Sequence, residues 1–211
     1  MSQKAHPKIF RIGFTENWFS RWFSKKNFVD NLKEDFLIRR FFSKQAREWG
    51  IEKVEIERQP GLLKIIIFSA RPGILIGRGG EGIEKIKNRL KKEVLKEQKT
   101  GDFKVEVIEV KDPWLSAPLI AQWVATQLEK RIPHRTVMKQ AMAKVFAKKE
   151  VKGARIELGG RLDGAEIARN AWLQKGRLPR QTIVANVDFA EETANLPYGT
   201  IGVKVWLYKE S

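Results

Sequence analysis

The chain has 211 residues, of which 41 are lysine or arginine and 25 are aspartate or glutamate, so its formal net charge is +16. A charge this large and one-sided favours a polyanionic partner, nucleic acid ahead of an anionic membrane surface, while a hydrophobic fraction of 42% suffices for a folded core. The absence of cysteine excludes disulfides, cysteine-ligated zinc and cysteine nucleophiles.

Residues 1–27 are predicted to form a basic arm, with six Lys or Arg side chains against one Glu. Trp18, Phe19, Trp22 and Phe23 are interleaved with these charges, a pattern that suits RNA, with cations on phosphates and rings on bases. The same rings could instead pin the arm onto the protein, and both interpretations stay open. An interfacial membrane anchor is disfavoured, because the run is short and interrupted. No signal-peptide core or bilayer-length apolar run is present, so we expect a soluble intracellular protein.

Residues 28–111 are predicted to form one domain. A helix over 28–49 is indicated by apolar residues at spacings of three and four, with Gly50 as its C-cap. The elements expected next are a strand at 53–58, a strand at 62–70, a short helix at 73–76, a helix over about 81–96 and a strand at 103–110.

A glycine loop, Gly77-Arg78-Gly79-Gly80, joins the last two of these helices. Glycine has no Cβ, so the backbone can approach a bulky anion, and the loop N–H groups and the following helix N-terminus then face the charge. Arg78 adds a full positive charge at the tip. The loop is therefore predicted to bind phosphate groups.

Gly77, Gly79 and Gly82 also satisfy the G-x-G-x-x-G pattern of dinucleotide-binding enzymes. That fold requires a strand directly before the loop, whereas Pro72 and Gly73 favour a helical turn there. No Lys-Ser or Lys-Thr pair follows the glycines, so a Walker phosphate loop is absent. The dinucleotide enzyme is kept as the less favoured alternative.

No catalytic or metal-binding constellation is apparent in the sequence. The two histidines are His6, in the basic arm, and His134, which follows Pro133 and is expected to start a helix or to contact RNA. Acidic residues are scattered among basic ones without a metal-ligand pattern. We therefore expect no enzymatic activity, no cofactor and no small-molecule substrate.

Asp112-Pro113 marks the predicted start of a second domain, over 112–211. The elements expected in it are helices at about 115–131 and 134–149 and strands at 151–159, 165–174, 182–189 and 199–209. Helices followed by consecutive strands predict an α+β fold, with two helices on an antiparallel sheet. Arg135 and Lys139 are one turn apart and share a helix face, which is either a solvated face or a nucleic-acid surface.

The loop I-G-x-x-G between two helices, flanked by strands, is the signature of the KH domain, whose G-x-x-G loop clamps backbone nucleotides. Further stretches are MSQKAHP at the start, ARPGILIGRGGE at 70–81, GARIELGGRLDGAEIAR at 153–169, KGRLP at 175–179 and YGTIGVKVW at 198–206. Together they resemble the family of bacterial small-subunit ribosomal protein S3. The resemblance implies a prokaryotic-type (type II) KH domain followed by an α+β domain, in the head of the small subunit of cytoplasmic ribosomes. The implied partners are ribosomal RNA, mRNA and neighbouring head proteins, without a membrane.

In that family, basic side chains at the junction of the two middle helices face the mRNA entry channel and help to unwind structured mRNA. The matching residues here are Lys130, Arg131, Arg135 and Lys139, whereas Thr136 stands where a second arginine often follows. The expected ribosomal-RNA contacts are Lys4, His6, Arg11, Lys85, Arg89, Arg155, Arg161, Arg169 and Arg177. A free-standing KH protein that regulates single-stranded RNA remains the alternative.

Overall fold

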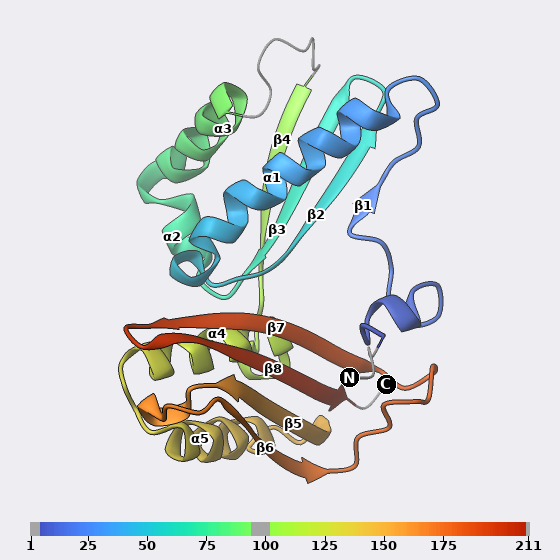
Figure 1. Cartoon of the computed structure of the whole chain (residues 1–211). Coiled ribbons are helices and arrows are strands. Elements are labelled where there is room, and N and C mark those ends of the chain that lie inside the picture. Colours follow the sequence, from blue (N-terminus) through green and yellow to red (C-terminus); the bar gives the residue numbers. More distant parts are fainter. Residues whose placement is uncertain (1–4, 94–101, 210–211) are drawn as a thin grey trace. The chain divides into compact units, whose positions relative to one another are not determined.

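Two four-stranded sheets, each with its own helices, make up the residues that the computed structural model describes, 5–93 and 102–209 (Figure 1). One sheet belongs to a compact unit over Trp18–Lys111. The other belongs to a unit that joins the residues up to Asn17 to those from Asp112 onward. The first 27 residues, expected as a single arm, are therefore divided between the two units.

The sheet of the Trp18–Lys111 unit has the order β1-β2-β3-β4, in which β2 and β3 are antiparallel and the outer pairs are parallel. Its strands are β1 (Ser20–Arg21), β2 (Ile51–Gln59), β3 (Leu62–Ser69) and β4 (Asp102–Glu109). Its helices are α1 (Phe28–Trp49), α2 (Pro72–Ile76) and α3 (Glu81–Glu93), with a 3-10 turn at Arg78–Gly80. The element order expected for a type II KH domain is thus present. The predicted end of α3 near residue 96 lies outside the described residues.

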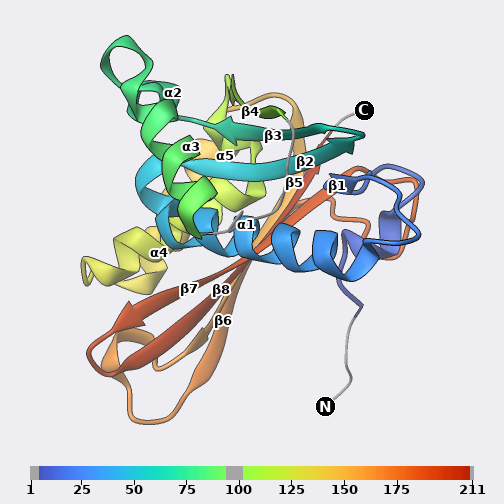
Figure 2. The same cartoon turned by 90° about the horizontal axis from the view of Figure 1, so that it is seen from above.

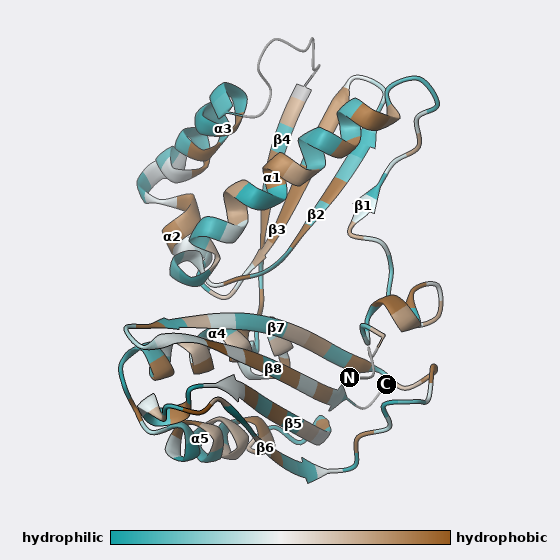
Figure 3. Ribbon diagram, viewed as in Figure 1, coloured by the Kyte–Doolittle hydropathy of each residue, from teal (hydrophilic) through white to brown (hydrophobic). Residues whose placement is uncertain are grey.

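The helices of this unit cover one face of the sheet, as the two views in Figures 1 and 2 show. Strand β3 supplies the centre of the core, because Leu63, Ile65 and Ile67 alternate toward the helices and are buried. The brown colour along β3 in Figure 3 reflects its nearly continuous apolar sequence. Helix α1 ends at Gly50, whose φ of 59° and ψ of 44° confirm the predicted left-handed C-cap.

The helix predicted over residues 28–49 is confirmed, but part of the apolar series that predicted it is not buried. The series Phe28, Leu32 and Phe36, which helped to predict the helix, lies on an exposed side of it. The buried side at this end instead carries Glu34 and Asp35, next to Ile38.

Buried acid on α1 is neutralised by Arg58 of β2. Its guanidinium donates to Glu34 Oε2 at 2.6 Å and to Asp35 Oδ1 at 2.6 Å. Trp22 Nε1 donates to Asp35 Oδ2 at 2.7 Å. This ring therefore pins its segment to the unit, whereas Trp18 and Phe23 are exposed.

The second unit has an antiparallel sheet with the order β6-β5-β8-β7. Its strands are β5 (Val151–Gly160), β6 (Arg169–Gly176), β7 (Val187–Leu196) and β8 (Gly199–Lys209). Helix α4 (Ala117–Glu129) packs on β7 and β8, and α5 (His134–Phe146) packs on β5 and β6. The predicted α+β fold of two helices on an antiparallel sheet is confirmed.

Two strand predictions in this sheet are misplaced. The strand expected at 165–174 starts only at Arg169, because Leu162–Gly164 forms a 3-10 turn in which Asp163 has φ 53°. The strand expected at 182–189 starts at Val187 and continues to Leu196. Its second half is polar and partly exposed, and it lies in the interval between the strands predicted at 182–189 and 199–209.

Candidate nucleic-acid interface

The glycine loop projects open backbone between α2 and α3. Gly79 has φ 61° and Gly80 has φ 86°, conformations that favour glycine, and a Cβ on either would meet nothing within 4 Å. Gly82 is different, because a Cβ there would lie 2.3 Å from the Leu75 carbonyl oxygen. Gly82 therefore allows the two helices to pack, whereas Gly79 and Gly80 are free to face a ligand.

Local structure before the loop argues against the dinucleotide alternative. That alternative requires a strand running directly into the first glycine. Helix α2 occupies this position instead, and Gly77 follows it with φ 68° and ψ −179°. Gly77, Gly79 and Gly82 thus lack the strand context of the dinucleotide pattern.

Exposed cations continue from the loop along α3. Ile86 and Leu90 are buried against the sheet, which leaves Lys85 and Arg89 exposed one turn apart, and Arg78 is exposed at the loop. Lys85 pairs with Glu81 at 3.2 Å, and both side chains are more than two-thirds exposed. A pair this exposed holds the lysine only weakly, so its charge remains available to an anion.

In the second unit, the junction between α4 and α5 carries four exposed cations, Lys130, Arg131, Arg135 and Lys139, here called the junction patch. Lys130 follows the last helical residue of α4, and Arg131 then turns the chain with φ 61°. The Arg131 N–H donates to the Leu128 carbonyl at 2.8 Å. Glycine is the residue usually found in this left-handed position after a helix. An arginine there places a charge at a conformationally unfavourable site.

His134 is the first residue of α5, and the Asp163 carboxylate binds both its backbone and its ring. The His134 backbone N–H donates to Asp163 Oδ1 at 3.1 Å, and its ring Nδ1 lies 2.6 Å from Asp163 Oδ2. Burial raises the pKa of Asp163, but the hydrogen bonds from His134 outweigh it and lower that pKa overall. His134 is 4% exposed, so of its two expected roles the structure supports the helix start. The sequence analysis assigned no role to Asp163, although the L-D-G sequence at 162–164 is typical of a tight turn and could have indicated a structural aspartate there.

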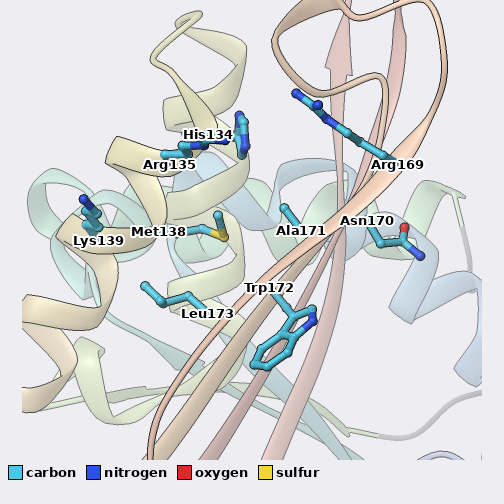
Figure 4. Close-up of a pocket in the computed structure, with 9 residues that line it drawn as sticks. All are labelled: His134, Arg135, Met138, Lys139, Arg169, Asn170, Ala171, Trp172 and Leu173. Atoms are coloured by element: carbon cyan, nitrogen blue, oxygen red, sulfur yellow. The ribbon is translucent and has the colours of Figure 1, made fainter.

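A groove of about 410 Å³ lies between α5 and the edge strand β6 (Figure 4). Its floor is apolar and its margin is basic. Met138 of α5 and Ala171 and Leu173 of β6 form the floor, and the cations at the margin are Arg135, Lys139 and Arg169. The groove therefore joins two residues of the junction patch to a cation that the sequence places 30 residues further along.

Comparison with known proteins matches both parts of the chain. The KH domain family matches residues 37–115, and the family of ribosomal protein S3, C-terminal domain, matches residues 124–207. Small ribosomal subunit protein uS3 of Clostridium botulinum is 44% identical over 210 residues, which cover 99% of this chain and 92% of that protein. The chain belongs to the uS3 family. The uS3 proteins of Lawsonia intracellularis and Maridesulfovibrio salexigens are 45% and 43% identical over 211 residues, covering 99% of this chain and 95% of each relative.

Family membership confirms the resemblance and the fold of a KH domain followed by an S3 carboxy-terminal domain. The uS3 proteins are structural components rather than enzymes. Within residues 5–93 and 102–209, no helix is long and apolar enough to cross a membrane.

One residue expected to contact ribosomal RNA through the uS3 resemblance is buried. Arg11 is 1% exposed, and its guanidinium donates to backbone carbonyls of its own segment and of a segment near residue 180. The acceptors are the carbonyl oxygens of Pro7, Pro179, Arg180, Thr182 and Ala185, at 2.9–3.3 Å. Burial also lowers the Arg11 pKa. The expectation for Arg11 is therefore corrected, since the side chain braces the protein interior instead of facing RNA.

Two further arginines in the expected uS3 set are largely occupied within the protein. Arg155 lies 4.5 Å from the Trp172 ring centroid and donates to Glu157 at 2.8 Å. Arg161 donates to the carbonyl oxygens of Ala165 and Tyr198, at 2.9 and 3.1 Å. Both side chains hold the second sheet and its adjoining turn, which leaves them little freedom to follow a phosphate.

The other expected contacts are exposed where they are described. His6, Lys85, Arg89, Arg169 and Arg177 face outward, and Lys4 lies outside the described residues. Lys175 and Arg180 are also exposed beside Arg177 but were not singled out. The run K-G-R-L-P-R was the available signal for them.

Proposed function

We propose that the chain is a structural constituent of the head of the small ribosomal subunit, in cytoplasmic ribosomes, and that it lines the channel through which mRNA enters. The chain matches proteins named small ribosomal subunit protein uS3 over nearly the whole length of both sequences. The partners are ribosomal RNA, mRNA and neighbouring head proteins. The junction patch faces the mRNA in this proposal, and the glycine loop faces RNA backbone.

The observation that carries the channel proposal is the backbone of Arg131. A left-handed φ of 61° costs a non-glycine residue about 1–2 kcal/mol. The chain nevertheless has arginine at this position, directly after Lys130 and three residues before α5 begins at His134. A basic side chain retained where glycine fits better supports a functional requirement for charge.

The mechanism in this proposal is electrostatic and passive. Lysine and arginine neutralise phosphates and release the counterions that surround RNA. Cations at the channel mouth hold a single strand once its hairpin opens, so closing is disfavoured while the ribosome advances. No nucleotide hydrolysis by this chain is required. For ribosomal RNA, the proposed contacts are His6, Lys85, Arg89 and Arg177, together with Lys4.

The test replaces Arg131, Arg135 and Lys139 with Ala in small subunits that are otherwise unchanged. We expect normal assembly, normal translation of unstructured mRNA and slower translation through a stable hairpin. The matched control replaces three exposed lysines of the Trp18–Lys111 unit that have no proposed RNA contact, Lys33, Lys44 and Lys91, which removes the same charge from the other unit. Equal rates through the hairpin for both triple variants and the wild type would refute the channel role.

A free-standing KH regulator remains the second candidate, because the glycine loop alone would serve it equally well. Sedimentation distinguishes the two. A structural constituent stays with small subunits through a high-salt gradient, whereas a regulator held mainly by phosphate contacts dissociates.

A further inference from the structure

The α5–β6 groove has the chemistry of a nucleotide site. Cations line its margin and no carboxylate is among its lining residues. Asp163, outside the lining residues, has both carboxylate oxygens bound by His134 and also attracts Arg169 electrostatically. Arg169 extends from β6 toward the start of α5 in Figure 4. Arg169 of β6 and Arg135 of α5 both line the groove, so an anion bound there would meet a cation from each element.

The floor supplies a surface for an unstacked base. Met138 is 6% exposed, and the half-buried Ala171 and Leu173 continue the same apolar surface on β6. A volume of about 410 Å³ lies at the small end of the range of about 300–1,000 Å³ for ligand sites. One nucleotide fits this size better than a stacked duplex, whose base faces are already covered. Single strands present such faces, and proteins recognise RNA mainly through them.

We propose that this groove seats one unpaired nucleotide of the mRNA, with its phosphate between Arg135 and Arg169 and its base on Met138, Ala171 and Leu173. The inference rests on the proposed function, since Arg135 and Lys139 belong to the junction patch. It adds a preference for single-stranded over paired RNA, and it assigns Arg169 to mRNA rather than to ribosomal RNA.

mRNA is favoured over a peptide as the occupant. The edge of β6 could accept an added strand from another protein, which would bind through backbone hydrogen bonds. Three cations around the opening, with no acidic partner among the lining residues, instead complement a polyanion.

A larger side chain on the apolar floor of the groove tests nucleotide binding without changing the charge of the protein. The full chain with Ala171→Phe is compared with wild type for a fluorescent single-stranded oligonucleotide and for a hairpin of the same composition. We expect single-strand affinity to fall about fivefold or more, the loss of one base contact, with hairpin affinity unchanged. Ala147→Phe, which changes an exposed alanine directly after α5 and outside the groove lining, should alter neither affinity. If Ala171→Phe binds both RNAs with wild-type affinity, the proposal that the groove binds a nucleotide is wrong.

Arg169 gives an independent readout, because it is exposed and its replacement spares the core. Each phosphate contact on a single strand contributes about 0.7 to the slope of log affinity against log salt. Arg169→Ala should reduce that slope by about 0.7, and Arg169→Lys should restore it. An unchanged slope for Arg169→Ala would refute the phosphate contact, even if Ala171→Phe failed to fold.

Small subunits identify the source of the RNA. An mRNA that carries thiouridine in its entering segment should photo-crosslink to the tryptic peptide over residues 170–175, and Ala171→Phe should abolish this crosslink. A crosslink of that peptide to ribosomal RNA or to a neighbouring protein would overturn mRNA as the occupant. If Ala171→Phe leaves RNA affinity unchanged while Arg135→Ala and Lys139→Ala weaken it, nucleotide binding in the groove is refuted and the channel role stands. If none of the three variants changes RNA affinity, both the groove proposal and the channel role are refuted.

Discussion

Lys8 and Asp188 form an ion pair of 2.9 Å that ties the amino-terminal segment to the second sheet. Asp188 is 7% exposed, and it also accepts the Ala117 N–H at 2.8 Å and lies 3.6 Å from Lys209 Nζ. One carboxylate thus joins the segment, the start of α4 and the end of β8. Removing its charge would leave two lysines without their counter-ion.

Asp188→Asn is expected to lower the free energy of unfolding by about 3 kcal/mol at pH 7, the penalty for breaking a buried pair. Burial raises the Asp188 pKa, but Lys8, Lys209 and the Ala117 N–H outweigh it, so the folded pKa is below its ordinary value of about 3.9. The stabilisation is therefore present above pH 4 and is lost as pH falls through the folded pKa. Denaturant unfolding of both proteins from pH 7 to pH 3 measures this. A gap between them that does not narrow below pH 4 would contradict the assignment.

Arg131 provides a prediction in which stability and function move in opposite directions. Arg131→Gly should raise the free energy of unfolding by about 1 kcal/mol, because glycine adopts φ 61° without strain. The same variant should bind RNA more weakly. Arg131→Ala keeps the strain and loses the charge, so it should weaken binding without the gain in stability. Thermal unfolding and RNA titration of the two variants check this, and equal stability of both would mean that the backbone is not strained.

The glycines of the loop are expected to respond differently to substitution. Gly79→Asp introduces negative charge into open space at a backbone conformation that Asp tolerates, so it should weaken RNA binding and leave the fold intact. Gly79→Asn, which has the same shape without the charge, should bind RNA better than Gly79→Asp. Gly82→Ala should instead lower stability by about 2 kcal/mol, because its Cβ overlaps the Leu75 carbonyl. Circular dichroism with RNA titration separates the two effects, and unfolding of Gly79→Asp would mean that the loop is a packing element.

Elements with strong local patterns were predictable from the sequence. Strand β3 has a continuous β-branched sequence, and the glycine loop with its flanking helices is defined by residues adjacent in the chain. Strand β7 was misplaced because its second half alternates small and polar residues, and pairing with β8 defines it as a strand. Local pattern does not contain that pairing.

Among the site residues, too, those defined by local sequence were predictable and those defined by long-range packing were not. The junction patch follows from local charge, and its four members are exposed as expected of a surface. Arg11 looked equally suited to RNA, but four of its carbonyl acceptors lie more than 165 residues away along the chain. The groove was not predictable either, because Arg169 meets α5 only through the packing of β6. Long-range packing, rather than residue type, decides which arginines face outward.

Helix α1 offers the sharpest test of which apolar residues are core. A helical period identifies apolar positions but not the side that the tertiary structure buries. Phe42 is 1% exposed, whereas Phe36 is 64% exposed on the same helix. Phe42→Ala should therefore lower the free energy of unfolding by about 3–5 kcal/mol, and Phe36→Ala should change it by less than about 0.5 kcal/mol. Denaturant unfolding of the full chain measures both, with the same chemical change in each variant. A comparable loss for Phe36→Ala would show that this side of α1 is covered within the chain.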